Sequence, residues 1–404
     1  MPSELANTNL FQPITIGKSI NLSHRIVIPP LTRSRATPDH VPTDLMLQHY
    51  DDLTKTPGSL VISEATFVSL KAAGWACVPG VWSEQQAKAW RKITDKVHAN
   101  GSYMCCQMWN LGRTATIEEL VREGTPYKSA SNIYISKEDE QKAIKLGNPL
   151  TPLTRQEIKE YIQLYADIAA RAVNEAGFDI VEIHSAHGYL FDQFFQSISN
   201  NRTDEYGGSI ENRARFFFEV VDSIIARVGG DRVACRISPW ATHGGMAGAN
   251  GDPHPIATFS YIFSELEKRR KQHGFAYVSI VEPRTNGSVT LREEDIVGDN
   301  EWVYEIYKGD IIRAGDYFDK RNPSDFSNII KDVDANDRTL ICLGRPSTSN
   351  PDIVEKLRNG WELNPYERKY FYNHDNYGYN TFARHGQDLK PTKEDKMIFG
   401  KPLA

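Results

Sequence analysis

Short apolar runs rich in β-branched residues alternate along the chain with longer segments in which apolar side chains recur at helical spacing. Runs such as 25–30 (RIVIPP) and 339–344 (TLICLG) are almost continuously apolar, which is typical of strands buried on both faces of a parallel sheet. The pattern predicts strands at 25–30, 59–66, 103–109, 179–185, 232–238, 276–282, 309–315 and 339–344.

The segments between these strands carry helix start and stop signals. Thr154 and Glu157 have the spacing of a capping box, in which each side chain satisfies a free backbone N–H group of the first turn. Asn350-Pro351 predicts a cap followed by proline at the first helical position, and Gly360 predicts the end of that helix. Two further predicted helix starts are Ser83 and Ser209.

Eight predicted strands that alternate with helices favour an α/β protein with a (β/α)8 TIM barrel. A doubly wound sheet is the main alternative, but no G-x-G-x-x-G follows the first strand. We expect one domain over 1–404. An N-terminal hairpin at 8–24 precedes the first strand, and a long insertion at 112–150 follows the third. A C-terminal extension at 361–404 is expected to wrap the outside.

Composition and charge exclude several classes of partner. The 404 residues are 40% apolar and 25% charged, with a net charge of −5, which is ordinary for a globular protein. Such a balance does not predict the broad basic face that nucleic acid or an anionic membrane needs. The expected partners are therefore small molecules.

The start of the chain and its cysteines indicate the compartment. The segment MPSELANTNLFQP lacks the basic start and apolar centre of a secretory signal, and no apolar run has membrane-spanning length. The five cysteines form no C-x-x-C pair. We therefore expect a cytoplasmic protein without disulfides or a metal centre. The oligomeric state stays open, with a homodimer among the possibilities.

In a (β/α)8 barrel the active site forms at the carboxyl ends of the strands. Gly315 follows the seventh predicted strand, and Gly344 and Arg345 follow the eighth. Glycine lets backbone N–H groups approach a phosphate, while arginine supplies charge and paired donors. These residues therefore predict a phosphate site, although a turn glycine beside a surface arginine would look the same in isolation.

Other strand ends offer groups that suit a flat, polar ring. Trp109 is a planar aromatic, Gln107 can pair with a polar ring edge, and Thr32 can donate a hydrogen bond. Arg236 lies within an apolar strand, where a charge is costly unless a polar partner meets it. FMN would use all of these groups. Pyridoxal phosphate would need a Schiff-base lysine, and none of the predicted strands ends in one.

The stretch HSAHGY follows the fourth predicted strand and contains His184, His187 and Tyr189. Taken alone, these side chains could bind a metal, fill a core or hold a substrate. A metal-dependent hydrolase is disfavoured, because no third ligand follows a strand and Tyr189 would have no role. Their position at a strand end favours substrate binding over the core.

The motifs together resemble the Old Yellow Enzyme family of FMN-dependent NADPH dehydrogenases and ene-reductases, and in particular its fungal branch. The most specific match is HSAHGYLFDQFF followed by NNRTDEYGGSIENRARF. The resemblance continues, in order along nearly the whole chain, through PPLTRSRA, QMWNLGR, RISP, VEPR, IRAG and GRPSTSNP.

The resemblance implies a role for each of these residues. His184 and His187 would bind the substrate's carbonyl or nitro oxygen, Tyr189 would donate a proton, and Trp109 and Tyr372 would line the substrate pocket. Residues implied in FMN binding are Pro30, Thr32, Gln107, Arg236, Gly315, Gly344 and Arg345.

The reaction that the resemblance implies has two halves. NADPH, with NADH as the alternative donor, reduces tightly bound, non-covalent FMN, and an α,β-unsaturated aldehyde, ketone or nitroalkene then receives a hydride from flavin N5 and a proton from Tyr189. A phenol with its ordinary pKa of about 10 suits the protonation of an enolate-like carbon. The alternatives are a flavin-dependent isomerase or cyclase, and a flavin-binding protein with little turnover. The loops 240–252 and 285–290 depart from the family and are expected to alter substrate preference.

Overall fold

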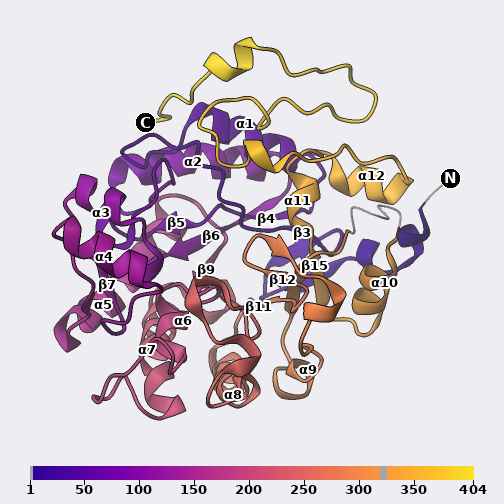
Figure 1. Ribbon diagram of the computed structural model, residues 1–404. Coiled ribbons are helices and arrows are strands. Elements are labelled where there is room, and N and C mark those ends of the chain that lie inside the picture. The colour runs from indigo at the N-terminus through magenta and orange to yellow at the C-terminus, as the bar shows by residue number, and fades with distance from the viewer. Residues whose placement is uncertain (1–2, 319–324) are drawn as a thin grey trace.

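The computed structural model describes residues 3–318 and 325–404, and a closed ring of parallel strands forms its centre (Figure 1). The ring closes because the last strand pairs with the first, with Ile341 beside Ile26. This confirms the predicted (β/α)8 barrel. In ring order the strands are β3 (Ile26–Ile28), β4 (Leu60–Ile62), β6 (Tyr103–Trp109), β9 (Ile180–His184), β10 (Val233–Ile237), β11 (Tyr277–Val281), β14 (Ile311–Ala314) and β15 (Thr339–Cys342).

The predicted strand at 59–66 is interrupted, so that β4 is followed by a separate short strand, β5 (Thr66–Phe67). The Ser63 and Thr66 hydroxyls both donate to the Glu64 carbonyl, at 2.9 and 2.8 Å. Local bonds of this kind compete with the hydrogen bonds of a sheet ladder. They explain why a continuous apolar pattern does not form one strand here.

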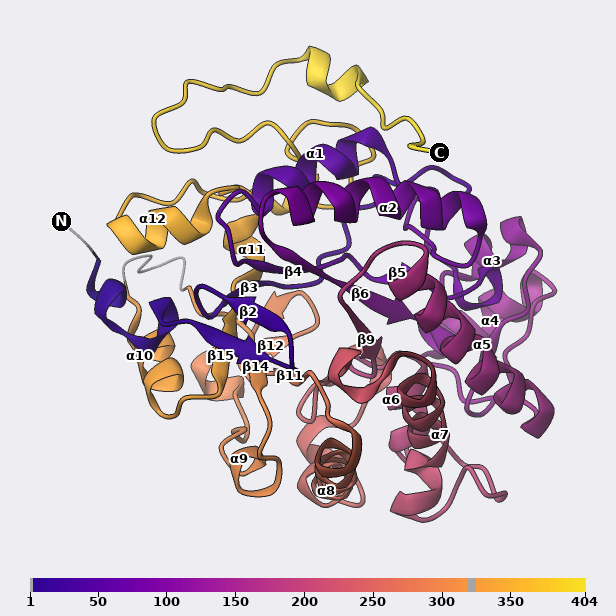
Figure 2. The ribbon, with the colours of Figure 1, turned by 180° about the vertical axis from the view of Figure 1, so that it is seen from behind.

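Helices surround the ring (Figures 1 and 2). Two of them begin at complete capping boxes. In α5 the Thr154 hydroxyl accepts from the Glu157 N–H and the Glu157 carboxylate accepts from the Thr154 N–H, as predicted. The main helices between the strands are α1 (Asp44–Leu53), α2 (Glu84–Ala99), α5 (Arg155–Asn174), α7 (Ile210–Val228), α8 (Pro255–His273), α9 (Val303–Ile306), α10 (Ser327–Asp334) and α12 (Ile353–Asn359).

The predicted start of α12 is wrong by two residues. The helix begins at Ile353, with Asp352 rather than Asn350 as its N-cap residue. The Asn350 side-chain oxygen instead accepts from the Lys356 ammonium at 2.9 Å and from the Asn364 N–H at 2.7 Å. Asn350 thus ties the helix to the chain that follows it. The end of α12 at Gly360, in a left-handed conformation, is as predicted.

The barrel interior forms one apolar cluster, and the N-terminal hairpin closes its lower end. Strands β1 (Ile14–Ile16) and β2 (Ile20–Leu22) pair antiparallel, as predicted for residues 8–24. Their buried side chains Ile16, Ile20 and Leu22 pack with inward residues of the ring such as Val27. The hairpin crosses the barrel at the end from which the strands rise (Figure 2). A site can therefore open only at the opposite end.

The insertion after β6 holds two helices, α3 (Ile117–Glu123) and α4 (Lys137–Lys145), and a short parallel pair, β7 (Lys128–Ser129) with β8 (Thr151–Pro152). Its apolar residues pack around the end of β6. The insertion thus builds one wall above the barrel.

The C-terminal segment runs outside α1 and lies apart from the ring in Figure 1. Two buried arginines that follow β3 attach it to the barrel. Arg33 donates to the Gly378 carbonyl at 2.8 Å, and Arg35 donates to the carbonyls of Phe371 at 2.8 Å and Asp375 at 3.0 Å. Because buried donors need partners, this pair positions the tail over one side of the pocket described below.

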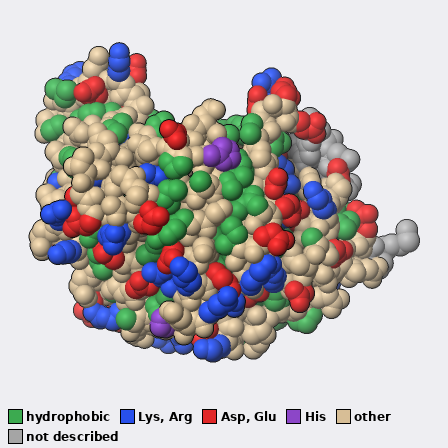
Figure 3. All heavy atoms as spheres, turned by 90° about the horizontal axis from the view of Figure 1, so that it is seen from below, with side chains coloured by type: hydrophobic (Ala, Val, Ile, Leu, Met, Phe, Trp, Pro, Cys, Tyr) green, Lys and Arg blue, Asp and Glu red, His purple; other side chains and the backbone are tan. Residues whose placement is uncertain are grey.

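Charged side chains of both signs are interspersed over the face shown in Figure 3. None of the helices in the described part of the chain is long and apolar enough to cross a membrane.

Candidate active site

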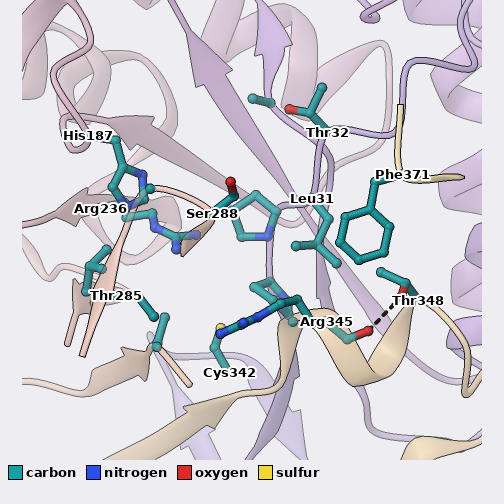
Figure 4. A pocket seen from close by; sticks show the side chains of 18 of the residues that line it. Leu31, Thr32, His187, Arg236, Thr285, Ser288, Cys342, Arg345, Thr348 and Phe371 are labelled. Carbon is teal, nitrogen blue, oxygen red and sulfur yellow. Dashed lines mark hydrogen bonds between the residues drawn. The ribbon is translucent and has the colours of Figure 1, made fainter. Parts of the chain in front are cut away.

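A cavity of about 440 Å³ opens at the carboxyl ends of the barrel strands. Every residue that the sequence singled out lines it, although those residues come from different strands, loops and the tail. Figure 4 shows His187 and Arg236 at one side of the cavity and Arg345 at the other. The predicted residues in its wall are Pro30, Thr32, Gln107, Trp109, His184, His187, Tyr189, Arg236, Gly315, Gly344, Arg345 and Tyr372.

Arg345 lies at the end of the cavity where β14 and β15 finish. Its guanidinium forms an ion pair with Asp316 at 2.5 Å and donates to the Thr290 hydroxyl at 2.7 Å. Gly315 has a φ of 139°, and a Cβ there would lie 2.9 Å from the Thr285 hydroxyl. The absence of a side chain therefore keeps this end open, with backbone and the Arg345–Asp316 ion pair facing the space.

Gln107 and Arg236 form the floor of the other end. The Gln107 side-chain N–H donates to the Glu182 carboxylate at 2.6 Å, and both residues are fully buried. The Arg236 Nε is buried without a hydrogen-bond partner among the described residues. A buried donor without a partner is costly, so this atom is available to a ligand.

The HSAHGY stretch forms a tight turn between β9 and α6 (Leu190–Phe195). His187 has a φ of 57°, an unfavourable value for a residue with a Cβ, so neighbouring contacts must hold it there. Its N–H donates to the Ser238 hydroxyl at 2.8 Å, and the Gly188 N–H donates to the Asp192 carboxylate at 2.8 Å. A Cβ on Gly188 would lie 2.6 Å from the His243 carbonyl oxygen. The turn is therefore fixed on both sides.

A buried amide joins this turn to the insertion. Gln193 donates to the carbonyls of Gly188 at 2.6 Å and Leu111 at 2.9 Å. Its side-chain oxygen accepts from the Arg113 N–H at 3.0 Å and the Ser129 hydroxyl at 2.8 Å. These four hydrogen bonds satisfy both the nitrogen and the oxygen of the Gln193 amide. Gln193 therefore fixes the insertion and the turn relative to each other.

The two histidines of the turn are neutral donors. Burial, the larger cause, and the nearby Arg236 charge hold the pKa of both His184 and His187 well below the ordinary value of 6.5. The Ala186 N–H approaches His184 Nδ1 at 3.4 Å, which leaves the proton on Nε2. His187 Nε2 is buried and has no hydrogen-bond partner in the described part of the chain. The rings lie 5.8 Å apart, centroid to centroid.

Tyr189 contacts both Trp109 and His184 edge-on, with ring centroids 4.9 and 4.6 Å apart. Burial raises the pKa of its phenol above the ordinary value of about 10, so the expectation of an unshifted phenol is wrong. The cause is the loss of solvent around a group that would become an anion. Tyr189 therefore holds its proton firmly until a strong base approaches.

Several pocket residues were not expected from the sequence. His243 lies 6.2 Å from His187 and 6.3 Å from Tyr189, centroid to centroid, and adds a third imidazole at the mouth. Phe371, next to Tyr372, also lines the cavity. Neither residue lies at a strand end. His243 belongs to the loop after β10, and Phe371 belongs to the C-terminal segment, so the strand pattern could not reveal them.

The two divergent loops contact each other at the mouth. The Asn286 amide donates to the Thr242 hydroxyl at 2.7 Å, and its oxygen accepts from the Thr242 N–H at 3.1 Å. Asn286 belongs to a small hairpin of β12 (Thr285–Asn286) and β13 (Val289–Thr290), whose last residue contacts Arg345. The hairpin therefore spans the cavity from the imidazoles to the arginine.

The cavity combines an open end with the Arg345 cation, a polar floor and aromatic walls, and the buried Nε of Arg236 has no hydrogen-bond partner among the described residues. This donor set fits a phosphorylated, hydrogen-bonding ring such as FMN. Among residues 3–318 and 325–404, no three His, Cys, Asp or Glu side chains are arranged to hold a metal ion.

Comparison with known proteins gives matches over almost the whole chain. Residues 9–364 match the model of the NADH:flavin oxidoreductase / NADH oxidase family. A probable NADPH dehydrogenase of Candida albicans is 44% identical over 403 residues, which cover 99% of this chain and 95% of that protein. Enoate reductase 1 of Kluyveromyces lactis is 44% identical over 405 residues, covering 99% and 98%. The crystal structure of Old Yellow Enzyme from Pichia sp. AKU4542 has a TM-score of 0.92 and 44% identity, covering 99% of this chain and all of that one.

Proposed function

Because the chain belongs to the NADH:flavin oxidoreductase / NADH oxidase family, it is an FMN-dependent oxidoreductase, and we propose that it reduces activated alkenes with NADPH as electron donor. The observation that carries the proposal is the convergence of two neutral imidazoles and one phenol beside a cavity with a cationic end. The proposed substrates are α,β-unsaturated aldehydes, ketones and nitroalkenes.

The chain's own residues would hold the cofactor at both ends. Gly315, Gly344 and Arg345 would bind the phosphate, since they offer backbone and charge at the open end. Arg236 would meet the ring edge where negative charge collects on reduction, and Gln107 would pair with the same edge. The bound flavin would supply hydride chemistry. Pro30 and Thr32 line the same wall and would contact the ring.

The substrate end needs donors for a developing oxyanion and an acid for the carbon. His184 and His187 are neutral imidazoles, and each has one N–H group that can donate a hydrogen bond to the same substrate oxygen. Tyr189 would give its proton to the α carbon. Its raised pKa keeps the phenol protonated until a strongly basic carbon forms beside it. Trp109 and Tyr372 would pack against the substrate.

A direct test is to purify the protein and record its absorbance spectrum. We expect flavin bands, release of FMN on denaturation, and oxidation of NADPH that depends on an added enone or nitroalkene when oxygen is excluded. A colourless protein that binds no added FMN would contradict the proposal. Fractionation of cells would test the cytoplasmic location that we also propose, and sedimentation would test for a homodimer.

Two variants of the ion pair at the cationic end should change FMN affinity in opposite directions. Arg345→Gln removes a charged donor and should weaken binding by about 10- to 100-fold, because hydrogen bonds to charged groups contribute about 1.5–3 kcal/mol. Asp316→Asn removes the carboxylate that pairs with Arg345 and should strengthen binding. Quenching of FMN fluorescence by the apoprotein measures both. Arg358→Gln, on α12, serves as control, and a change equal to its effect would remove Arg345 from the site.

His243 is expected to set substrate preference rather than chemistry, because it stands at the mouth beyond His187. His243→Phe keeps a ring but removes its N–H. For alkenes that carry a second polar group, kcat/KM should fall by about two- to tenfold, the worth of one hydrogen bond. A simple enone should react as before. An equal change with both kinds of substrate would count against the assignment.

A further inference from the structure

A fully buried carboxylate lies below the ring end of the cavity, and the reaction above gives it no role. Glu182 stands in the middle of β9, where it is the register partner of Gln107 on β6 and of Ala234 on β10. Its side chain is inaccessible to solvent. Burying an ionisable group is expensive, so its neighbours must account for it.

The first neighbour is Gln107, whose side-chain nitrogen donates to Glu182 at 2.6 Å. The Glu182 oxygen is the acceptor in this contact, so it faces the nitrogen of the amide rather than its oxygen. The Gln107 oxygen is then left for a donor in the cavity. Glu182 thereby orients the Gln107 amide so that a bound ring would meet its oxygen rather than its nitrogen.

The second neighbour is Arg236, which stands two residues beyond Ala234 and so one layer nearer the cavity. Burial raises the pKa of Glu182, whereas the Arg236 charge opposes that rise, as do hydrogen bonds from Gln107 and Tyr277. The Glu182 carboxyl group and the Arg236 guanidinium therefore interact through their charges without forming a direct ion pair among the described residues. Any ring above them lies in the field of both.

We propose that Glu182 is a positioning residue of the flavin site, which orients the Gln107 amide and lowers the reduction potential of the bound FMN. The charge that collects at the ring edge on reduction is attracted by Arg236 and repelled by Glu182. The carboxylate thus limits how far the arginine stabilises the reduced form. A lower potential favours hydride donation to the alkene. This inference rests on the proposed function, since it needs FMN in the cavity.

The test is a potentiometric titration of the FMN-loaded protein, followed by its absorbance. Glu182→Gln removes the charge with little change in shape. We expect the ratio of affinities for reduced and oxidised FMN to rise at least tenfold, which is about 30 mV for a two-electron couple. The affinity for oxidised FMN should fall, because the new amide can donate to the Gln107 oxygen and turn it. Cys105→Ser alters the barrel interior one layer below, level with Ile180, without a change in charge, and should shift the ratio less than twofold.

Glu182→Asp separates the two effects and remains informative if the glutamine variant does not fold. It keeps the charge but shortens the reach to Gln107, so FMN should bind more weakly at a nearly unchanged potential. A Glu182→Gln shift no larger than that of Cys105→Ser would overturn the inference, as would a rise of tenfold or more with Glu182→Asp. Wild-type protein that binds no FMN would instead contradict the proposed function. FMN bound normally, with a potential indifferent to Glu182, would refute only this inference.

Discussion

Replacement of Tyr189 by phenylalanine is expected to slow alkene reduction by about 10²- to 10⁴-fold, the usual contribution of a general acid. The variant keeps the edge-on contacts with Trp109 and His184 and loses only the hydroxyl. Reduction of the flavin by NADPH should stay nearly normal, since that step needs no proton from the phenol. Stopped-flow spectroscopy follows the two half-reactions separately.

A matched control is available on the far side of α6. Tyr165 is buried, packs 5.2 Å from Phe191, and has a hydroxyl without a hydrogen-bond partner among the described residues. Tyr165→Phe removes a phenolic oxygen near the site without touching the cavity, so both half-reactions should be unaffected. If Tyr189→Phe reduced alkenes at the wild-type rate, another group would have to supply the proton.

The second large effect is expected from His187→Ala, which should slow alkene reduction by about 10²- to 10³-fold, as removal of an oxyanion donor does in other enzymes. The buried Nε2 of His187 has no partner among the described residues, so it can donate to a ligand at no cost to the fold. Phenolate ligands should also bind more weakly, because they place an oxygen anion at the same point. Their long-wavelength flavin band reports that binding.

His187→Asn is the informative companion variant. Asparagine keeps an N–H donor and tolerates the left-handed φ of 57° better than most residues, so it should retain much of the activity. His184→Ala tests the other donor in the same way. Normal phenolate binding in both alanine variants would remove the imidazoles from the oxyanion site.

The barrel could be predicted from the sequence because several inner strands are nearly continuous apolar runs and several helices, such as α5, begin at a local capping signal. The residues at strand ends were found for the same reason, since the fold alone brings Thr32, Gln107 and Arg236 to one edge. Features that depend on contacts between distant segments were missed. Asn350 could not be recognised as a partner of Asn364, because either residue alone looks like a helix cap.

The same limit explains the missed parts of the site. Glu182 lies inside a strand pattern, and only the register with Gln107 reveals what it faces. The position of His243 depends on the loop contact between Thr242 and Asn286, and no periodicity encodes that contact. The raised pKa of Tyr189 is a property of burial, which the residue type does not disclose.

The attachment of the tail to Arg33 and Arg35 has a consequence for how the protein is made. These arginines directly follow the first strand of the barrel, whereas Phe371 and Tyr372 follow the last one. The ring can close only when β15 is present to pair with β3. During translation the first strand and its arginines leave the ribosome long before their partners exist. The cavity therefore gains its last wall only after Phe371 has been synthesised, 336 residues after Arg35. Truncation of the last 40 or so residues should accordingly leave a barrel whose pocket has lost one wall.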